Sequence, residues 1–263
     1  MTLLSISALI ALIPAAILPF RGSGRRDALF WLLLGVALAG PLLWLILAFG
    51  TGWRTGLAPA LWLTVATVLV FFGLIAAVSR EGFRLSALVF PYLILLGLIA
   101  TAALDQSGQP MAGAAPAGWV YLHIVVSLET YAVLTLAAIA GVSTFLQDRA
   151  LKNKKATTLT RVLPTLSAGE SLELKLLGLT AGILGIGLLT GMVVQYLDTG
   201  VLLIVNHKTF LSFATFAIVI ILLWVRWRTG LRGRKAARIV LFAYLLLTLA
   251  YPGVKFVSDV LIG

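Results

Sequence analysis

The chain has 263 residues, a formal net charge of +11 and no cysteine. Without cysteine it has no disulfides, no thiol nucleophile, no Cys-ligated zinc or iron–sulfur site, and no means of holding haem covalently through its own thiols. Hydrophobic residues make up 61% of the chain and charged residues 11%, whereas soluble domains contain roughly 45–50% and about 25%. The composition therefore predicts an all-α integral membrane protein.

Eight apolar segments are long enough to span a bilayer. The first lacks a basic start, because Arg21 is the first charged side chain, so we interpret it as a retained helix rather than a signal peptide. Gly40-Pro41 interrupts the second and predicts a kink. We expect a polytopic bundle of eight transmembrane helices in one domain, with four helices and an outer loop in 1–117 and four helices in 118–263. The segments are 2–20, 28–49, 59–78, 85–104, 118–146, 171–196, 208–227 and 238–257.

Positive charge is concentrated in alternate connections. Because basic residues favour the cytoplasmic side of a membrane, the odd-numbered connections are predicted to be cytoplasmic, and both the N-terminus and the C-terminus outside. The charge then serves topology and attraction to anionic lipid, and we expect no nucleic-acid partner, since no basic run carries interleaved aromatic residues. Sixteen of the twenty Lys and Arg residues lie in odd connections: Arg21, Arg25, Arg26, Arg80, Arg84, Arg149, Lys152, Lys154, Lys155, Arg161, Arg226, Arg228, Arg232, Arg234, Lys235 and Arg238.

The sixth segment carries two local signals. Ser167 and Glu170 have capping-box spacing before the apolar run, which predicts a helix start there. Gly178/Gly182 and Gly187/Gly191 have GxxxG spacing, which favours close helix packing within the bundle, with a substrate cleft or a dimer face as alternatives.

The only two histidines, His123 and His207, fall near the outer ends of the fifth and seventh segments. Each lies about ten residues from the middle of its helix, on the order of 15 Å from the bilayer midplane. Neutral imidazole is a ligand for haem iron, zinc and copper. The matched depth favours a shared site, although each histidine alone is compatible with a simple interfacial side chain. A divalent metal held with Asp105 or Asp198 is a further alternative.

Other polar groups surround this level of the membrane. Glu129 is predicted about 9 Å below His123 and pointing roughly 120° away from it. A carboxylate at that depth indicates a functional or hydrogen-bonded packing residue, while Ser127 and Thr130 lie nearer the His123 face. Trp119 fits an aromatic belt or a ligand platform. Lys208 and Lys255 are candidate contacts for an acidic ligand, and Lys255 has i,i+4 spacing to Asp259.

Three stretches carry a family resemblance. They are "GWVYLHIVVSLETYAVLTLAAIAGVSTFLQDRALK", "LPTLSAGESLELKLL" and the run beginning "NHKTFLSF", within about 118–256. They resemble the cytochrome c assembly protein family (CcsA/CcmC type), and within it the eight-helix YpjD-like subgroup.

The resemblance implies a non-enzymatic, multi-pass protein of the bacterial inner membrane that binds haem at its outer face. External histidines are the family's axial iron ligands, which supports His123 and, with less force, His207. From the residues themselves we expect Lys208 and Lys255 as propionate or partner contacts, Trp119 as a packing surface and Glu129 as a buried supporting group. The implied partners are haem and other membrane proteins of cytochrome c assembly.

The sequence also departs from the family pattern. The family's Trp-rich motif is expected before the seventh segment, yet "QYLDTGVLLIVNHK" contains no tryptophan, and no histidine follows the eighth segment. These departures favour, as the alternative, an accessory subunit or small-solute transporter that keeps the fold without haem.

Overall fold

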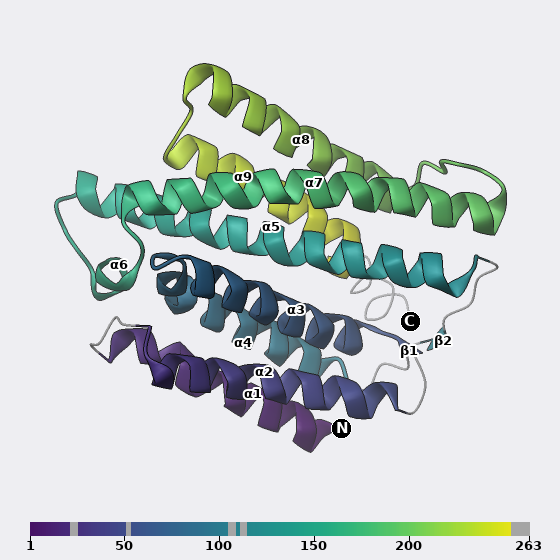
Figure 1. Cartoon of the computed structure of the whole chain (residues 1–263), viewed down its shortest axis with the longest axis horizontal. Coiled ribbons are helices and arrows are strands. Elements are labelled where there is room, and N and C mark those ends of the chain that lie inside the picture. The colour runs from purple at the N-terminus through teal and green to yellow at the C-terminus, as the bar shows by residue number, and fades with distance from the viewer. Residues whose placement is uncertain (22–25, 51–53, 105–108, 111–114, 254–263) are drawn as a thin grey trace.

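The computed structural model describes residues 1–21, 26–50, 54–104, 109–110 and 115–253, and within these it is almost entirely helical. The long helices lie alongside one another in layers, with α1 and α2 on one side and α8 on the other (Figure 1). The helices are α1 (Thr2–Ile17), α2 (Ala28–Phe49), α3 (Leu57–Val78), α4 (Ser86–Ala102), α5 (Ala117–Lys152), α6 (Thr158–Val162), α7 (Leu166–Thr199), α8 (His207–Thr229) and α9 (Arg234–Thr248), with short turns η1 (Leu18–Phe20), η2 (Gly82–Leu85) and η3 (Leu249–Gly253).

Seven of the described helices are long and apolar enough to cross a membrane, which makes this a multi-pass membrane protein. Large apolar side chains also face outward along the outer helices, as lipid contact requires; examples are Ile10, Leu43, Ile46, Ile221 and Trp224. The eighth predicted segment appears as α9, 15 residues long, continued by the π-helical turn η3. The count of eight spans and the sides of the two termini stay predictions.

Odd and even connections gather at opposite ends of the bundle (Figure 1). We call the end with the α1–α2, α3–α4, α5–α7 and α8–α9 connections the basic end, and the other the opposite end. At the opposite end two even connections pair directly, because β1 (Arg54–Thr55) and β2 (Gln109–Pro110) form a short antiparallel ladder. At the basic end the Arg26 guanidinium donates to the carbonyls of Ala76 and Ala77 at the last turn of α3, both at 2.6 Å.

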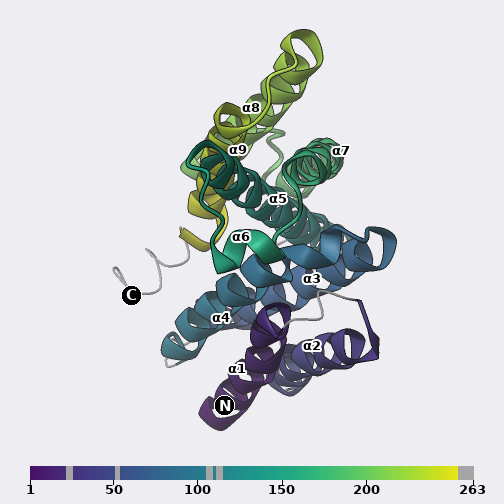
Figure 2. The same ribbon diagram turned by 90° about the vertical axis from the view of Figure 1, so that its left-hand side faces the viewer.

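The fifth helix is the centre of the fold. α5 contacts α3 and α4 on one side and α7 and α9 on the other (Figure 2). Its middle is buried on every face, from Thr130 to Gly141. At 36 residues it is about 54 Å long, which exceeds the roughly 30 Å hydrocarbon core, so it projects beyond the membrane.

Helix boundaries show where the sequence reading was imprecise. α5 continues to Lys152 rather than 146, because its polar last turns remain helical. The predicted capping box at Ser167–Glu170 was wrong: the N-cap of α7 is Thr165, whose hydroxyl accepts from the Ala168 amide at 3.4 Å. Pro164 lies directly before that cap and cannot continue a helix.

α2 runs as one helix through Gly40-Pro41. A Cβ on Gly40 would lie 2.9 Å from the Ala8 backbone, so this glycine allows α1 and α2 to approach closely.

One buried ion pair joins α7 to α8 near the basic end. The Arg226 guanidinium donates to Glu173 Oε1 at 2.7 Å, and their side chains are only 5% and 1% exposed. Arg226 also donates to the Glu170 carbonyl at 3.4 Å. A charge at this depth is tolerated because its partner is present, so the pair fixes how α8 sits on α7.

Candidate functional site

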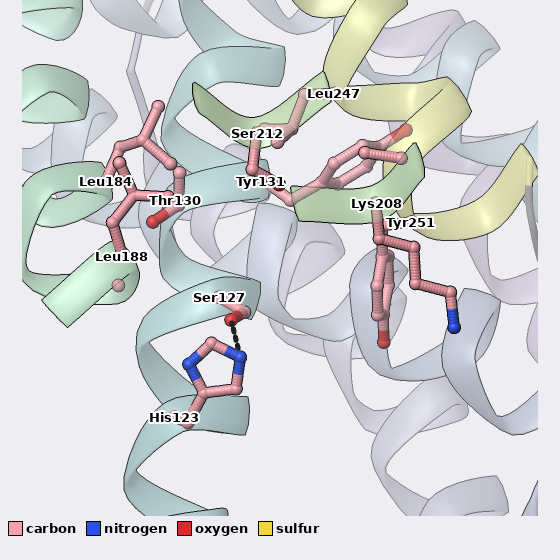
Figure 3. A pocket seen from close by; sticks show the side chains of 12 residues that line it. His123, Ser127, Thr130, Tyr131, Leu184, Leu188, Lys208, Ser212, Leu247 and Tyr251 are labelled. Carbon is pink, nitrogen blue, oxygen red and sulfur yellow. Dashed lines mark hydrogen bonds between the residues drawn. The ribbon is translucent and has the colours of Figure 1, made fainter. Parts of the chain in front are cut away.

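A cavity of about 180 Å³ lies nearer the opposite end, between α5, α7, α8, α9 and η3 (Figure 3). One wall is apolar and comes from Leu184, Leu188 and Leu247, while hydroxyl, imidazole and ammonium groups line the rest. The complete lining is His123, Ser127, Thr130, Tyr131, Leu184, Gly187, Leu188, Lys208, Ser212, Leu247, Ala250 and Tyr251.

The His123 imidazole is held from both sides. Its Nδ1 lies 3.2 Å from Thr190 Oγ1 on α7, and its Nε2 lies 3.5 Å from Ser127 Oγ, one turn along α5. Figure 3 shows the Ser127 contact on the cavity side of the ring. The predicted proximity of Ser127 and Thr130 to the His123 face is confirmed, because both line the same cavity.

Two glycines of α7 make room for this arrangement. A Cβ on Gly191 would lie 2.9 Å from His123 Cε1, closer than real Cβ contacts, and a Cβ on Gly187 would touch Val126 and Thr130. The Gly187/Gly191 pair therefore packs within the bundle, as predicted. Gly178 and Gly182, by contrast, have no described atom within 4 Å of such a Cβ, so the packing predicted for that pair within the bundle was wrong.

A chain of hydroxyl groups leads away from the cavity through Tyr131. Its oxygen lies 3.0 Å from the Tyr244 hydroxyl and 3.2 Å from Thr248 Oγ1, and Tyr244 also contacts the Tyr92 hydroxyl. Thr248 donates its own proton to the Tyr244 carbonyl, so it accepts from Tyr131. Tyr131 then accepts from Tyr244, and Tyr244 from Tyr92. The hydrogen bonds thus run in one direction and link α4 to the cavity wall.

Of the adjacent pair His207 and Lys208, only Lys208 lines the cavity. Asn206 is the N-cap of α8, and its Oδ1 accepts from the Thr209 amide at 2.9 Å and the Thr209 hydroxyl at 3.0 Å. This cap fixes the first turn and leaves both His207 and Lys208 exposed. Lys208 is thereby the cationic group at the edge of the cavity.

The other predicted site residues lie elsewhere. Trp119 is 41% exposed on the first turn of α5, as an aromatic belt residue would be, and it does not line the cavity. Glu129 is half-buried and is also absent from the lining, in agreement with the predicted 120° offset. Lys255, Asp259 and Asp105 fall outside the described residues. Within the described part of the chain, no three His, Cys, Asp or Glu residues cluster as a metal site.

Sequence reasoning did not select Thr190, Tyr131, Tyr251 or Ser212. Threonine and tyrosine are ordinary residues of apolar helices, so their type alone gives no signal. Thr190 had one usable signal: it stands directly before Gly191, in the glycine pair that was predicted to pack closely.

With this geometry in view, comparison with known proteins decides the family. The family model for "Cytochrome C assembly protein" matches residues 55–262. The chain belongs to the cytochrome c assembly protein family. The match begins earlier than the resemblance recognised from residue 118, so α3 and α4 share the family pattern.

Individual relatives agree with this assignment. An "Uncharacterized 28.8 kDa protein" of Azospirillum brasilense is 49% identical over 98% of this chain and 97% of its own length. The "Inner membrane protein YpjD" of Escherichia coli K12 is 31% identical over 53% of this chain and 52% of its own. The "Cytochrome c biogenesis protein CcsA" of Chlamydomonas reinhardtii is 25% identical over 66% and 49%. The chain thus matches about half the length of the last two. No solved structure matches.

Proposed function

We propose that this protein binds haem non-covalently in the cavity between α5, α7, α8, α9 and η3, and presents it at the outer face of a bacterial inner membrane. The observation that carries the proposal is the His123 imidazole, which lines a cavity with one apolar wall and with Lys208 at its edge. Imidazole is the commonest protein ligand of haem iron, and an ammonium group complements a propionate.

The donor set fits haem, and the dimensions limit how it would be held. The cavity encloses about 180 Å³, whereas pockets that bury a drug-sized ligand enclose roughly 300–1,000 Å³. A porphyrin would therefore be only partly enclosed, with its iron near His123 and an acidic edge near Lys208. Partial enclosure suits a protein that receives haem and passes it on. The haem iron would then act in a partner protein and not in a reaction at this cavity. We accordingly propose a binding role, without enzyme activity, alongside membrane proteins of cytochrome c assembly.

His207 has a weaker claim to the iron than His123, because it does not line the cavity. We retain it as the candidate second axial ligand only for a state in which the first turn of α8 moves. The absence of tryptophan from 195–208 removes the Trp-rich motif expected there.

The test is an absorption spectrum of protein purified from haem-replete membranes, before and after haemin is added. We expect a Soret band that is lost in His123→Ala, retained in His207→Ala and weakened in Lys208→Ala. Absence of the band from wild-type protein under both conditions would refute haem binding. A band equally strong in His123→Ala would refute the choice of ligand.

The missing tryptophans support one second candidate, an accessory subunit or small-solute transporter that retains the fold. Solute flux in reconstituted vesicles, or co-purification with a transporter without haem, would favour it.

A further inference from the structure

The described contacts of His123 define where its ring proton lies. Thr190 Oγ1 lies 3.1 Å from the Gly187 carbonyl and 3.2 Å from His123 Nδ1. A carbonyl accepts only and a hydroxyl has one proton, so if Thr190 donates to Gly187 then Nδ1 must carry a proton and donate to Thr190.

The opposite tautomer satisfies fewer of these groups. With the proton on Nε2, Thr190 would donate to Nδ1, and its oxygen would face the Gly187 carbonyl across 3.1 Å with no proton between them. With the proton on Nδ1, Ser127 can still donate to Nε2 across 3.5 Å. All of the contacts are therefore satisfied only by the Nδ1-protonated ring.

We propose that α7 positions His123 for its ligand, with Thr190 and Gly187 fixing the Nδ1-protonated tautomer and Gly191 leaving the space in which the ring lies. The Nε2 lone pair then lies on the side of Ser127, which lines the cavity and is the one hydrogen-bonding partner of Nε2 within the described part of the chain. This inference rests on the proposed haem function for its purpose, because an iron atom needs that lone pair. Hydrogen bonds to the remote nitrogen commonly fix ligand histidines in this way.

The tautomer can be measured without haem. The protein contains only two histidines, so selective ¹⁵N-histidine labelling gives two ring systems, and His207→Gln identifies the one from His123. We expect the Nδ1-protonated pattern in wild-type protein. Thr190→Val keeps the side-chain shape and removes the hydroxyl, so it should shift the population towards the Nε2-protonated form, while Thr190→Ser should restore the wild-type pattern. Thr180→Val on the same helix is the matched control and should leave the tautomer unchanged, because the Thr180 hydroxyl donates to the Leu176 carbonyl at 2.8 Å and does not line the cavity.

Haem titration is the second measurement. Thr190→Val should weaken haem binding by about 10- to 100-fold, the usual effect of losing a hydrogen bond to a metal-ligating histidine, and Thr190→Ser should recover most of it. An Nε2-protonated wild-type ring, or a Thr190→Val ring unchanged in tautomer, would overturn the positioning role. A wild-type protein with the expected tautomer but no haem affinity would instead refute the proposed function, so the two failures are distinguishable.

Discussion

Gly191→Ala perturbs the contact between α5 and α7 at one point. The added methyl carbon would lie 2.9 Å from His123 Cε1 and 3.4 Å from Nδ1, whereas ordinary contacts begin at 3.4 Å. The ring must therefore move away from α7 by about 0.5 Å. That shift extends the 3.2 Å Nδ1–Thr190 contact to about 3.7 Å, beyond hydrogen-bonding range.

The energetic consequence follows from three contributions. Overpacking a well-filled site costs about 1–3 kcal/mol, and the lost interhelical hydrogen bond costs about 0.6 kcal/mol in a membrane protein. Replacing a helical glycine by alanine returns up to about 1 kcal/mol. We expect Gly191→Ala to lower the free energy of unfolding by roughly 1–3 kcal/mol and to weaken haem binding by about 10-fold or more.

Gly182→Ala is the matched control on the same helix. No described atom lies within 4 Å of its added carbon, so it should be neutral or stabilising by up to about 1 kcal/mol. Unfolding in a mild detergent, followed by tryptophan fluorescence, and haemin titration measure both effects. If the two alanine variants are indistinguishable in stability and in haem affinity, the space at Gly191 has no role in holding His123 and the reasoning fails.

Three further outcomes follow from other contacts. Arg226→Met should destabilise the protein by about 3–5 kcal/mol, because it leaves Glu173 buried without its partner. The double variant Glu173→Leu/Arg226→Met should recover most of that loss. Equal unfolding free energies for the single and double variants would contradict this expectation. Tyr244→Phe removes two hydroxyl contacts and should cost about 1–2 kcal/mol, measured by denaturant unfolding with Tyr196→Phe, on an exposed side chain, as control. Asn206→Ala should lower the free energy of unfolding by about 0.5–2 kcal/mol, because α8 loses its N-cap. It should also weaken haem binding, because the cap fixes the turn that carries Lys208. Unchanged thermal unfolding would argue against that cap.

The helices were predictable because bilayer thickness imposes a length on apolar runs. Seven of the eight predicted segments correspond to described helices of spanning length, and the alternation of basic connections matches their grouping at one end of the bundle. The ends were less predictable. Polar last turns stay helical where tertiary contacts or hydrogen bonds support them, as in the α5 extension, where Gln147 donates to the Thr160 and Pro164 carbonyls.

The candidate site was predictable only in part. His123 stands out because histidine is rare in this chain. Helical periodicity alone places Ser127 and Thr130 near it. The choice between His207 and Lys208 needed the fold: consecutive residues on a helix point about 100° apart, so only one of them readily faces a given cavity. Tyr131 and Tyr251 reach the cavity from helices far apart in the sequence, a relation that no local pattern contains.

Helix α7 links the ion pair near the basic end to the His123 site near the opposite end. Near the basic end, Glu173 fixes α7 to Arg226 of α8, and near the opposite end Thr190 and Gly191 hold His123 of α5. The two points are 17 residues apart, about 25 Å along the helix axis. Because α7 is anchored at both points, the α8 turn that carries Lys208 has a defined position relative to His123. A cavity assembled from α5, α7, α8, α9 and η3 can keep one geometry in this way, which the proposed binding and release of haem would require.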